Sequence, residues 1–280
     1  MEITEKTEEA ILDRTEEIKR KLIPQELPKV KELPVSPKEV TNEEKEIIAL
    51  IEDLGSLEWS KVQEATEKLA NLGKVAIPKL SEALKEASVG LKGQIVFLLG
   101  RIGDKAATPT LIETLKDESP YIRRNAAEAL GKIKDEQAIF ELTKALFDED
   151  GSVRERSAWV LGELEDNRSI EDLINRMIDE KEERVKSAVV DAFAKIKDQR
   201  ATLVLLKELS SKSNYLYKNE VVFALGEIGD PRALPGLIEH LDYLKQLQPT
   251  EPMIIFLWEE AIKITEEAIQ KIREKQGDRL

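Results

Sequence analysis

One six-residue pattern returns along the sequence at a nearly constant interval, and this period limits the possible folds more than any other feature. The pattern joins a large apolar residue, a small residue, a charged residue, an aliphatic residue, one variable residue and an aspartate. Its five aspartates are 31, 31, 32 and 32 residues apart: Asp104, Asp135, Asp166, Asp198 and Asp230. An upstream basic residue keeps the same intervals: Lys92, Arg123, Arg154, Lys186 and Lys218. Two positions that hold one period over five copies indicate tandem repeats, each of them one supersecondary unit.

The apolar residues within one unit predict two helices. The first helix of the third unit places them three or four positions apart, on one face: Ile122, Ala126, Ala129, Leu130 and Ile133. A second helix carries Ile139, Leu142, Ala145 and Leu146. Neither helix could bury its apolar face alone, so neighbouring hairpins have to stack. The sequence therefore predicts an all-α solenoid of about six helical hairpins.

The small residue and the aspartate of the pattern each have a predicted role. Because Ala194 replaces glycine in one copy, the position requires small size rather than a positive φ angle, and we expect it to let the two helices of a hairpin approach closely. The aspartates lie where the second helix needs an N-cap. Their separation, one per repeat, is too large for shared metal ligation. We expect them to cap helices and to pair with the repeated basic residues of neighbouring repeats.

The two ends of the chain differ from the middle. Residues 1–37 are predicted to form an N-terminal arm, an amphipathic helix followed by a proline-rich linker. Residues 38–280 are predicted to form the repeat array, which begins with a helix ending at Leu54 and a degenerate hairpin from Trp59. A long helix over Met253–Lys275 is expected to cap the C-terminal end.

Composition excludes several functions. The 280 residues carry a formal net charge of −13, which argues against nucleic-acid and anionic-membrane partners, because both attract basic proteins. The sequence contains no cysteine and one histidine, His240, interpreted as a residue of the helix surface or last turn. Carboxylates in the turns between helices, such as Asp148 and Asp150, are interpreted as solvated. We therefore expect no metal, no cofactor and no catalysis. Without a signal peptide or a long apolar run, the expected location is the cytoplasm.

Three stretches carry a resemblance to a known family. Ile122–Ile133, Val153–Leu164 and Gly226–Pro235 resemble the HEAT repeat of the phycobilisome-lyase-like subclass, and the resemblance covers roughly residues 59–242. It implies a HEAT-like α–α superhelix. Similar repeats occur in bilin lyases, in deoxyhypusine hydroxylase and in many scaffolds. The hydroxylase needs several His-Glu pairs to hold two irons, and a chain with one histidine cannot supply them.

The resemblance also implies which side chains face the concave surface. The positions between the apolar ones of each first helix form a column in which aromatic and acidic residues alternate: Phe97, Glu128, Trp159, Asp191 and Phe223. Arg101, Arg124, Asn125 and Arg156 flank this column. With Trp159 at its centre, the column is the candidate protein-binding site. Alternatively, these aromatic side chains pack sideways against neighbouring hairpins.

Three classes of function follow. The favoured one is a non-catalytic protein-binding scaffold or assembly factor that binds an extended or helical segment with basic and apolar residues. The second is a bilin lyase-like or tetrapyrrole-handling protein that acts with a partner subunit. The third is a structural subunit of a larger complex.

Overall fold

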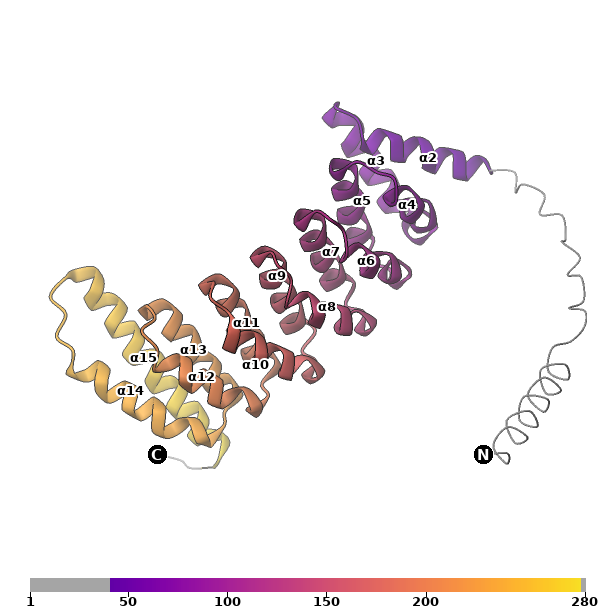
Figure 1. Cartoon of the computed structure of the whole chain (residues 1–280). Coiled ribbons are helices and arrows are strands. Elements are labelled where there is room, and N and C mark those ends of the chain that lie inside the picture. Colours follow the sequence, from indigo (N-terminus) through magenta and orange to yellow (C-terminus); the bar gives the residue numbers. More distant parts are fainter. Residues whose placement is uncertain (1–40, 278–280) are drawn as a thin grey trace, which may run out of the picture. The chain divides into compact units, whose positions relative to one another are not determined.

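The structure, a computed structural model, describes residues 41–277, so the predicted arm at residues 1–37 lies outside the described part. Residues 41–277 form fourteen α-helices and no strand (Figure 1). Six hairpins follow one another: α3 (Trp59–Leu72) with α4 (Ile77–Leu84), α5 (Val89–Ile102) with α6 (Thr108–Thr114), α7 (Pro120–Ile133) with α8 (Ile139–Ala145), α9 (Gly151–Glu163) with α10 (Ile170–Asp179), α11 (Glu183–Ile196) with α12 (Thr202–Leu209), and α13 (Tyr215–Ile228) with α14 (Leu234–Gln246). Helix α2 (Asn42–Leu54) precedes them and α15 (Pro252–Lys275) follows. The predicted all-α solenoid is confirmed.

The helices of the array form two layers. Successive first helices pack directly on one another, from α3 through α5, α7, α9 and α11 to α13, and α15 packs against α13 as a seventh member of this layer. The second helices, α4 to α14, follow on the other side (Figure 1). Between the layers runs one continuous core of Leu, Ile, Val and Ala side chains, which begins at α2 and ends at α15. An aliphatic core of this kind follows from helices that each bury one apolar stripe.

The small residue of the repeated pattern sets the distance between neighbouring first helices. A Cβ atom added to Gly100 would lie 2.9 Å from the Cα atom of Ala129, and one added to Gly162 would lie 2.7 Å from the Cα atom of Ala192. Small size is therefore the requirement, as predicted. The predicted neighbour was wrong, because the close approach is to the first helix of the next repeat and not to the partner within the hairpin.

The repeated aspartates are caps, as predicted, but the helix they cap is a short 3-10 turn that leads into each second helix. Asp104 and Asp166 each accept a hydrogen bond of 2.8 Å from the backbone N–H two residues later. Asp135 and Asp230 also accept from a threonine hydroxyl of the preceding repeat, Thr108 and Thr202 respectively, at 2.9 and 2.8 Å. The expected pairing of these aspartates with the repeated basic residues is wrong.

The repeated basic residues instead bind the turns between repeats. Arg123, on α7, donates from Nε and Nη2 to the carboxylate of Asp148, both at 2.7 Å. Its Nη1 donates to the carbonyl oxygens of Asp117 and Glu118, at 2.9 and 3.1 Å. The arginine therefore connects the turn before its own hairpin to the turn after it. Asp148 is nearly buried by this contact, which corrects its interpretation as a solvated residue.

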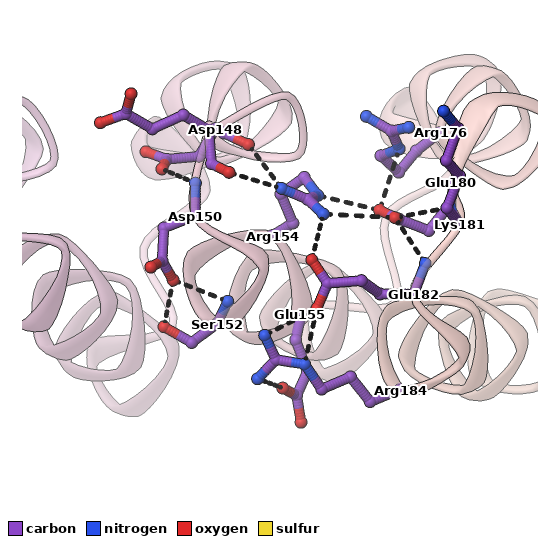
Figure 2. Close-up of polar contacts among 11 residues, drawn as sticks. Asp148, Asp150, Ser152, Arg154, Glu155, Arg176, Glu180, Lys181, Glu182 and Arg184 are labelled. Atoms are coloured by element: carbon purple, nitrogen blue, oxygen red, sulfur yellow. Dashed lines mark hydrogen bonds and ion pairs between the residues drawn. The ribbon is translucent and has the colours of Figure 1, made fainter.

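Arg154 repeats this arrangement one hairpin later (Figure 2). Its Nη1 donates to the Asp148 carbonyl at 2.9 Å, and its Nε donates to the buried carboxylate of Glu180 at 2.8 Å. A third contact joins its Nη2 to Glu182, also at 2.8 Å. Burial raises the pKa of Glu180, but hydrogen bonds from Arg154 and from two backbone N–H groups outweigh it and lower that pKa to about 2. We call this chain of guanidinium–turn contacts the arginine ladder.

Beyond Arg154, a lysine continues the ladder with an ion pair to one carboxylate. The ladder ends in the sixth hairpin. Lys186 binds Glu208 on α12 at 2.9 Å. In α14, His240 stands at the helical position that Glu208 has in α12, so at this position Lys218 faces an imidazole instead of a carboxylate. His240 is 9% exposed, which corrects its interpretation as a surface residue. Burial, with a smaller effect from Lys218, lowers its pKa to about 4.

We predict that Arg154→Ala lowers the free energy of unfolding by about 3 kcal/mol, because the buried Glu180 carboxylate loses both contacts with this guanidinium and keeps one ion pair, with Arg176 at 3.3 Å. Arg184→Ala is the matched control. Arg184 makes two ion pairs, but it is half-exposed, so its loss should cost less than about 1 kcal/mol. Urea unfolding of both variants measures the difference. Equal costs would show that the ladder does not stabilise the array.

We predict that the array loses up to about 3 kcal/mol of stability as the pH falls from 6.5 to 4. The folded pKa of His240 lies below its unfolded value, so the unfolded chain binds the extra proton in this window and the folded state is penalised. His240 is the single histidine of the sequence, so His240→Gln should flatten the dependence. The comparison needs urea unfolding at pH 7, 6, 5 and 4.5. An unchanged slope in the variant would assign the effect to other groups.

Candidate functional site

A wide groove of about 1060 Å³ opens on the outer side of the first-helix layer, across α9, α11, α13 and α15. We call it the α9–α15 groove. Helix periodicity explains its lining. On α13, residues three, four and seven positions apart face the groove: Leu216, Asn219, Glu220 and Phe223. The residues between them, such as Tyr217 and Val221, are buried in the core.

Aromatic and aliphatic side chains form the floor of the groove. Trp159 comes from α9, Phe223 from α13, and Phe256 and Leu257 from α15. Trp159 is 37% exposed, and Phe223 and Phe256 are more exposed still. A soluble protein rarely gathers exposed rings in a concave surface unless that surface binds something.

Trp159 lies between two cations of its own chain. The guanidinium carbon of Arg156 is 5.2 Å from the ring centroid, and the Nζ of Lys195 is 5.7 Å away. Lys195 also binds Asp191 at 2.6 Å and Glu163 at 2.7 Å. Burial lowers the pKa of Lys195, but these two carboxylates outweigh it and raise that pKa, so the lysine stays charged. The indole is therefore held in one place while one part of it remains accessible.

The carboxylates of the groove fall into two groups. Asp191 is paired with Lys195, and Glu155 is paired with Arg184 at 3.2 Å. Glu220, on α13, and Glu260, on α15, also line the groove, and neither forms an ion pair with any residue between 41 and 277. These two acids give the groove its uncompensated negative charge, beside the apolar floor.

The structure divides the residues predicted for the site between separate places. Arg156, Trp159, Asp191 and Phe223 line the α9–α15 groove. Phe97, Asn125 and Glu128 line another pocket of about 340 Å³, on α5 and α7. Arg101 lines a pocket of about 190 Å³ on the other side of Phe97, and Arg124 is half-buried and lines none of these three.

Sequence periodicity missed the contribution of α15 to the groove. Phe256, Leu257, Glu260 and Ile264 line the groove from α15, and they lie outside the 31- and 32-residue period. One signal was available, the apolar run from Met253 to Trp258 at the start of the last helix. A helix that only caps an array has no need of exposed Phe256.

In residues 41–277, no cluster of three or more His, Asp or Glu side chains could hold a metal ion. No helix within the same range is both long and apolar enough to cross a bilayer.

The chain is similar to known helical-repeat proteins. A model of HEAT repeats matches residues 77–162, 141–223 and 170–243. No curated protein matches the sequence significantly. Among solved structures, YibA of Escherichia coli is similar with a TM-score of 0.57 and 22% identity, over 82% of this chain and 81% of YibA. An archaeal HEAT-like repeats protein from Thermococcus onnurineus has a TM-score of 0.55 and 17% identity, over 80% of this chain and 98% of its own.

A complex of CpcE and CpcF of phycocyanin lyase from Nostoc is also similar. The TM-score is 0.47 with 23% identity, over 53% of this chain and 98% of that one. The similarities to YibA and to the Thermococcus onnurineus protein, at 22% and 17% identity, show the fold alone.

We predict that Trp159→Ala lowers the free energy of unfolding by only about 1–2 kcal/mol, because the ring is partly exposed on the groove floor. Phe193→Ala, on the neighbouring helix α11, provides the comparison. Phe193 is fully buried in the core, and its truncation should cost about 3–5 kcal/mol. Chemical unfolding of the two variants decides between a surface and a core role. Equal costs would mean that Trp159 serves mainly to hold neighbouring hairpins together.

Proposed function

Because this chain belongs to the HEAT-repeat family, we propose that it is a non-catalytic scaffold that binds a segment of another protein in the α9–α15 groove. The observation that carries this proposal is the group of accessible rings on the groove floor, Trp159, Phe223 and Phe256. Interface energy concentrates on central aromatic and arginine side chains, and solenoid surfaces of this kind commonly bind elongated ligands. We further assign the repeats to the phycobilisome-lyase-like subclass on the motif at Ile122–Ile133.

The chemistry of the groove specifies the ligand. Apolar side chains of the ligand pack against the rings, and basic side chains pair with Glu220 and Glu260, which lack counterions among residues 41–277. Asp191 contributes less to this attraction because Lys195 already neutralises it.

The dimensions of the groove specify the form of the ligand. The groove crosses four parallel helices, and neighbouring helices pack about 8–10 Å apart, so its length is roughly 30 Å. A helix of about 20 residues or an extended strand of about nine residues spans this distance.

Site-specific photo-crosslinking tests the proposal. A benzophenone amino acid replaces Ala188, which lines the groove on α11, or Leu203, which is exposed on α12 in the other layer. We expect one discrete cross-linked protein from position 188 in cells of the native host and none from position 203. The cross-link should disappear when Trp159→Ala and Phe223→Ala are added.

A matched variant separates binding from general surface effects. Phe140 on α8 is an exposed aromatic residue in the second-helix layer, so Phe140→Ala should leave the cross-link from position 188 unchanged. Circular dichroism confirms that each variant is folded. A cross-link that persists in a folded Trp159→Ala, Phe223→Ala variant would contradict the proposal.

A further inference from the structure

A second concave surface lies on the three hairpins before the α9–α15 groove; it shares no lining residue with the groove, although its Glu128 pairs with Arg156 of the groove at 3.9 Å. It is the pocket of about 340 Å³ on α3, α5 and α7, and three successive first helices each place one aromatic ring in it: Trp59, Phe97 and Tyr121. Trp59 is 67% exposed and Tyr121 is 54% exposed. We call these three rings the aromatic triad.

A glycine gives Tyr121 its position. A Cβ atom added to Gly93 would lie 3.0 Å from Cε1 of Tyr121 and 3.3 Å from its hydroxyl oxygen. The tyrosine ring therefore lies directly against the backbone of α5, in a place that a side chain at position 93 would fill. This contact holds Tyr121 in the pocket although half of its surface remains open to solvent.

The charges around the pocket are already balanced. Lys132 lies over the Phe97 ring, 5.3 Å from its centroid, and pairs with Glu128 at 3.1 Å. Burial raises the pKa of Glu128, but Lys132 and Arg156 outweigh it and lower that pKa, so the pair stays charged and mutually neutralised. A cationic ligand would have to displace Lys132, and an anionic one would meet Glu128. The pocket therefore favours an uncharged ligand.

The pocket also carries hydrogen-bond donors that lack acceptors. The Nε1 of Trp59, the hydroxyl of Tyr121 and the side-chain amide of Asn125 make no hydrogen bond with any residue from 41 to 277. By contrast, Trp258 Nε1 donates to the carbonyl oxygen of Leu244 at 2.7 Å. The free donors on the aromatic side chains suit a ligand that brings carbonyl oxygens close to the rings.

A polyproline-II segment combines these properties. Its backbone makes no internal hydrogen bonds, so its carbonyl oxygens are free to accept, and its pyrrolidine rings are flat, apolar and uncharged. One turn takes three residues and rises about 9 Å, which equals the packing distance of neighbouring helices, about 8–10 Å. Prolines three residues apart would therefore meet rings on successive first helices. Aromatic grooves with ring-borne donors are a general means of binding such segments.

We propose that the aromatic triad is a second, independent docking site, and that it binds a polyproline-II segment with prolines at every third position. The site goes beyond the proposed scaffold function, because it adds a ligand of different chemistry on the neighbouring hairpins. The two sites together would allow one chain to hold two unlike segments at a fixed separation.

The test uses a fluorescein-labelled decaproline peptide and the full chain, with fluorescence anisotropy as the readout. We expect saturable binding, at least tenfold weaker in a Trp59→Ala, Tyr121→Ala variant and unchanged in the Trp159→Ala, Phe223→Ala variant. A labelled Gly-Ser peptide of the same length is the ligand control. The second variant keeps this test separate from the proposed function, because loss of the α9–α15 groove should not alter decaproline binding.

A tryptophan signal provides a second measurement on folded protein. In a Trp159→Phe, Trp258→Phe variant, Trp59 is the remaining tryptophan, and decaproline should shift its emission with the same midpoint as the anisotropy. Absence of saturable binding at millimolar peptide, equal binding of the Gly-Ser peptide, or an undiminished affinity in Trp59→Ala, Tyr121→Ala would overturn the proposal. Stronger binding of a labelled decalysine peptide would overturn it as well, in favour of a cation site.

Discussion

The arginine ladder fixes the positions of the middle hairpins on their neighbours, and the rest of the array depends on it. The turn after α8 shows how: it gives the Asp148 carboxylate to Arg123 and the Asp148 carbonyl to Arg154. This turn is thus bound by the arginine before it and the arginine after it. Buried ion pairs contribute little net stability over an apolar contact, but they tolerate only one geometry. The ladder therefore mainly sets how far each first helix is shifted along the axis of its neighbour. The aliphatic core supplies most of the stability.

The two ends of a first helix make different kinds of contact with neighbouring repeats: ion pairs near one end and close backbone packing near the other. The ladder acts near its N-terminal end, where Arg123 and Arg154 lie. Near its C-terminal end, a glycine such as Gly100 brings the next first helix into backbone contact. A lengthened side chain at the glycine would push neighbouring helices apart, whereas a shortened arginine would leave their distance intact and release their register. The two devices are complementary, because one limits translation along the helix axis and the other limits separation.

The repeat period predicted the structure within each repeat correctly. It did not predict the contacts between repeats. The hairpins, the aspartate caps and the small-residue position all follow from one unit read alone. The partners of the basic residues do not, because the acids have no fixed interval: Asp148 follows Arg123 by 25 residues, and Glu208 follows Lys186 by 22. Asp148 lies in the turn after α8, whereas Glu208 lies inside α12, so the acid has no fixed place relative to its second helix. The contribution of α15 to the groove could not be predicted for a related reason: α15 lies outside the repeat period and yet lines the groove.

The position of α15 also restricts how such a chain can change over evolutionary time. Repeat arrays commonly grow and shrink by duplication or loss of whole units, and most of the surface tolerates this because every unit has equivalent neighbours. Here Phe256 and Leu257, from outside the repeat, face Phe223 of the last hairpin across one groove. A unit inserted between α14 and α15 would move that wall by one repeat and separate the rings. Insertion upstream of α9 would leave the groove whole. Because the aromatic triad spans α3, α5 and α7, within the six hairpins only a unit inserted between α8 and α9 would leave both sites whole, so the array is free to vary in length near its middle and constrained at both ends.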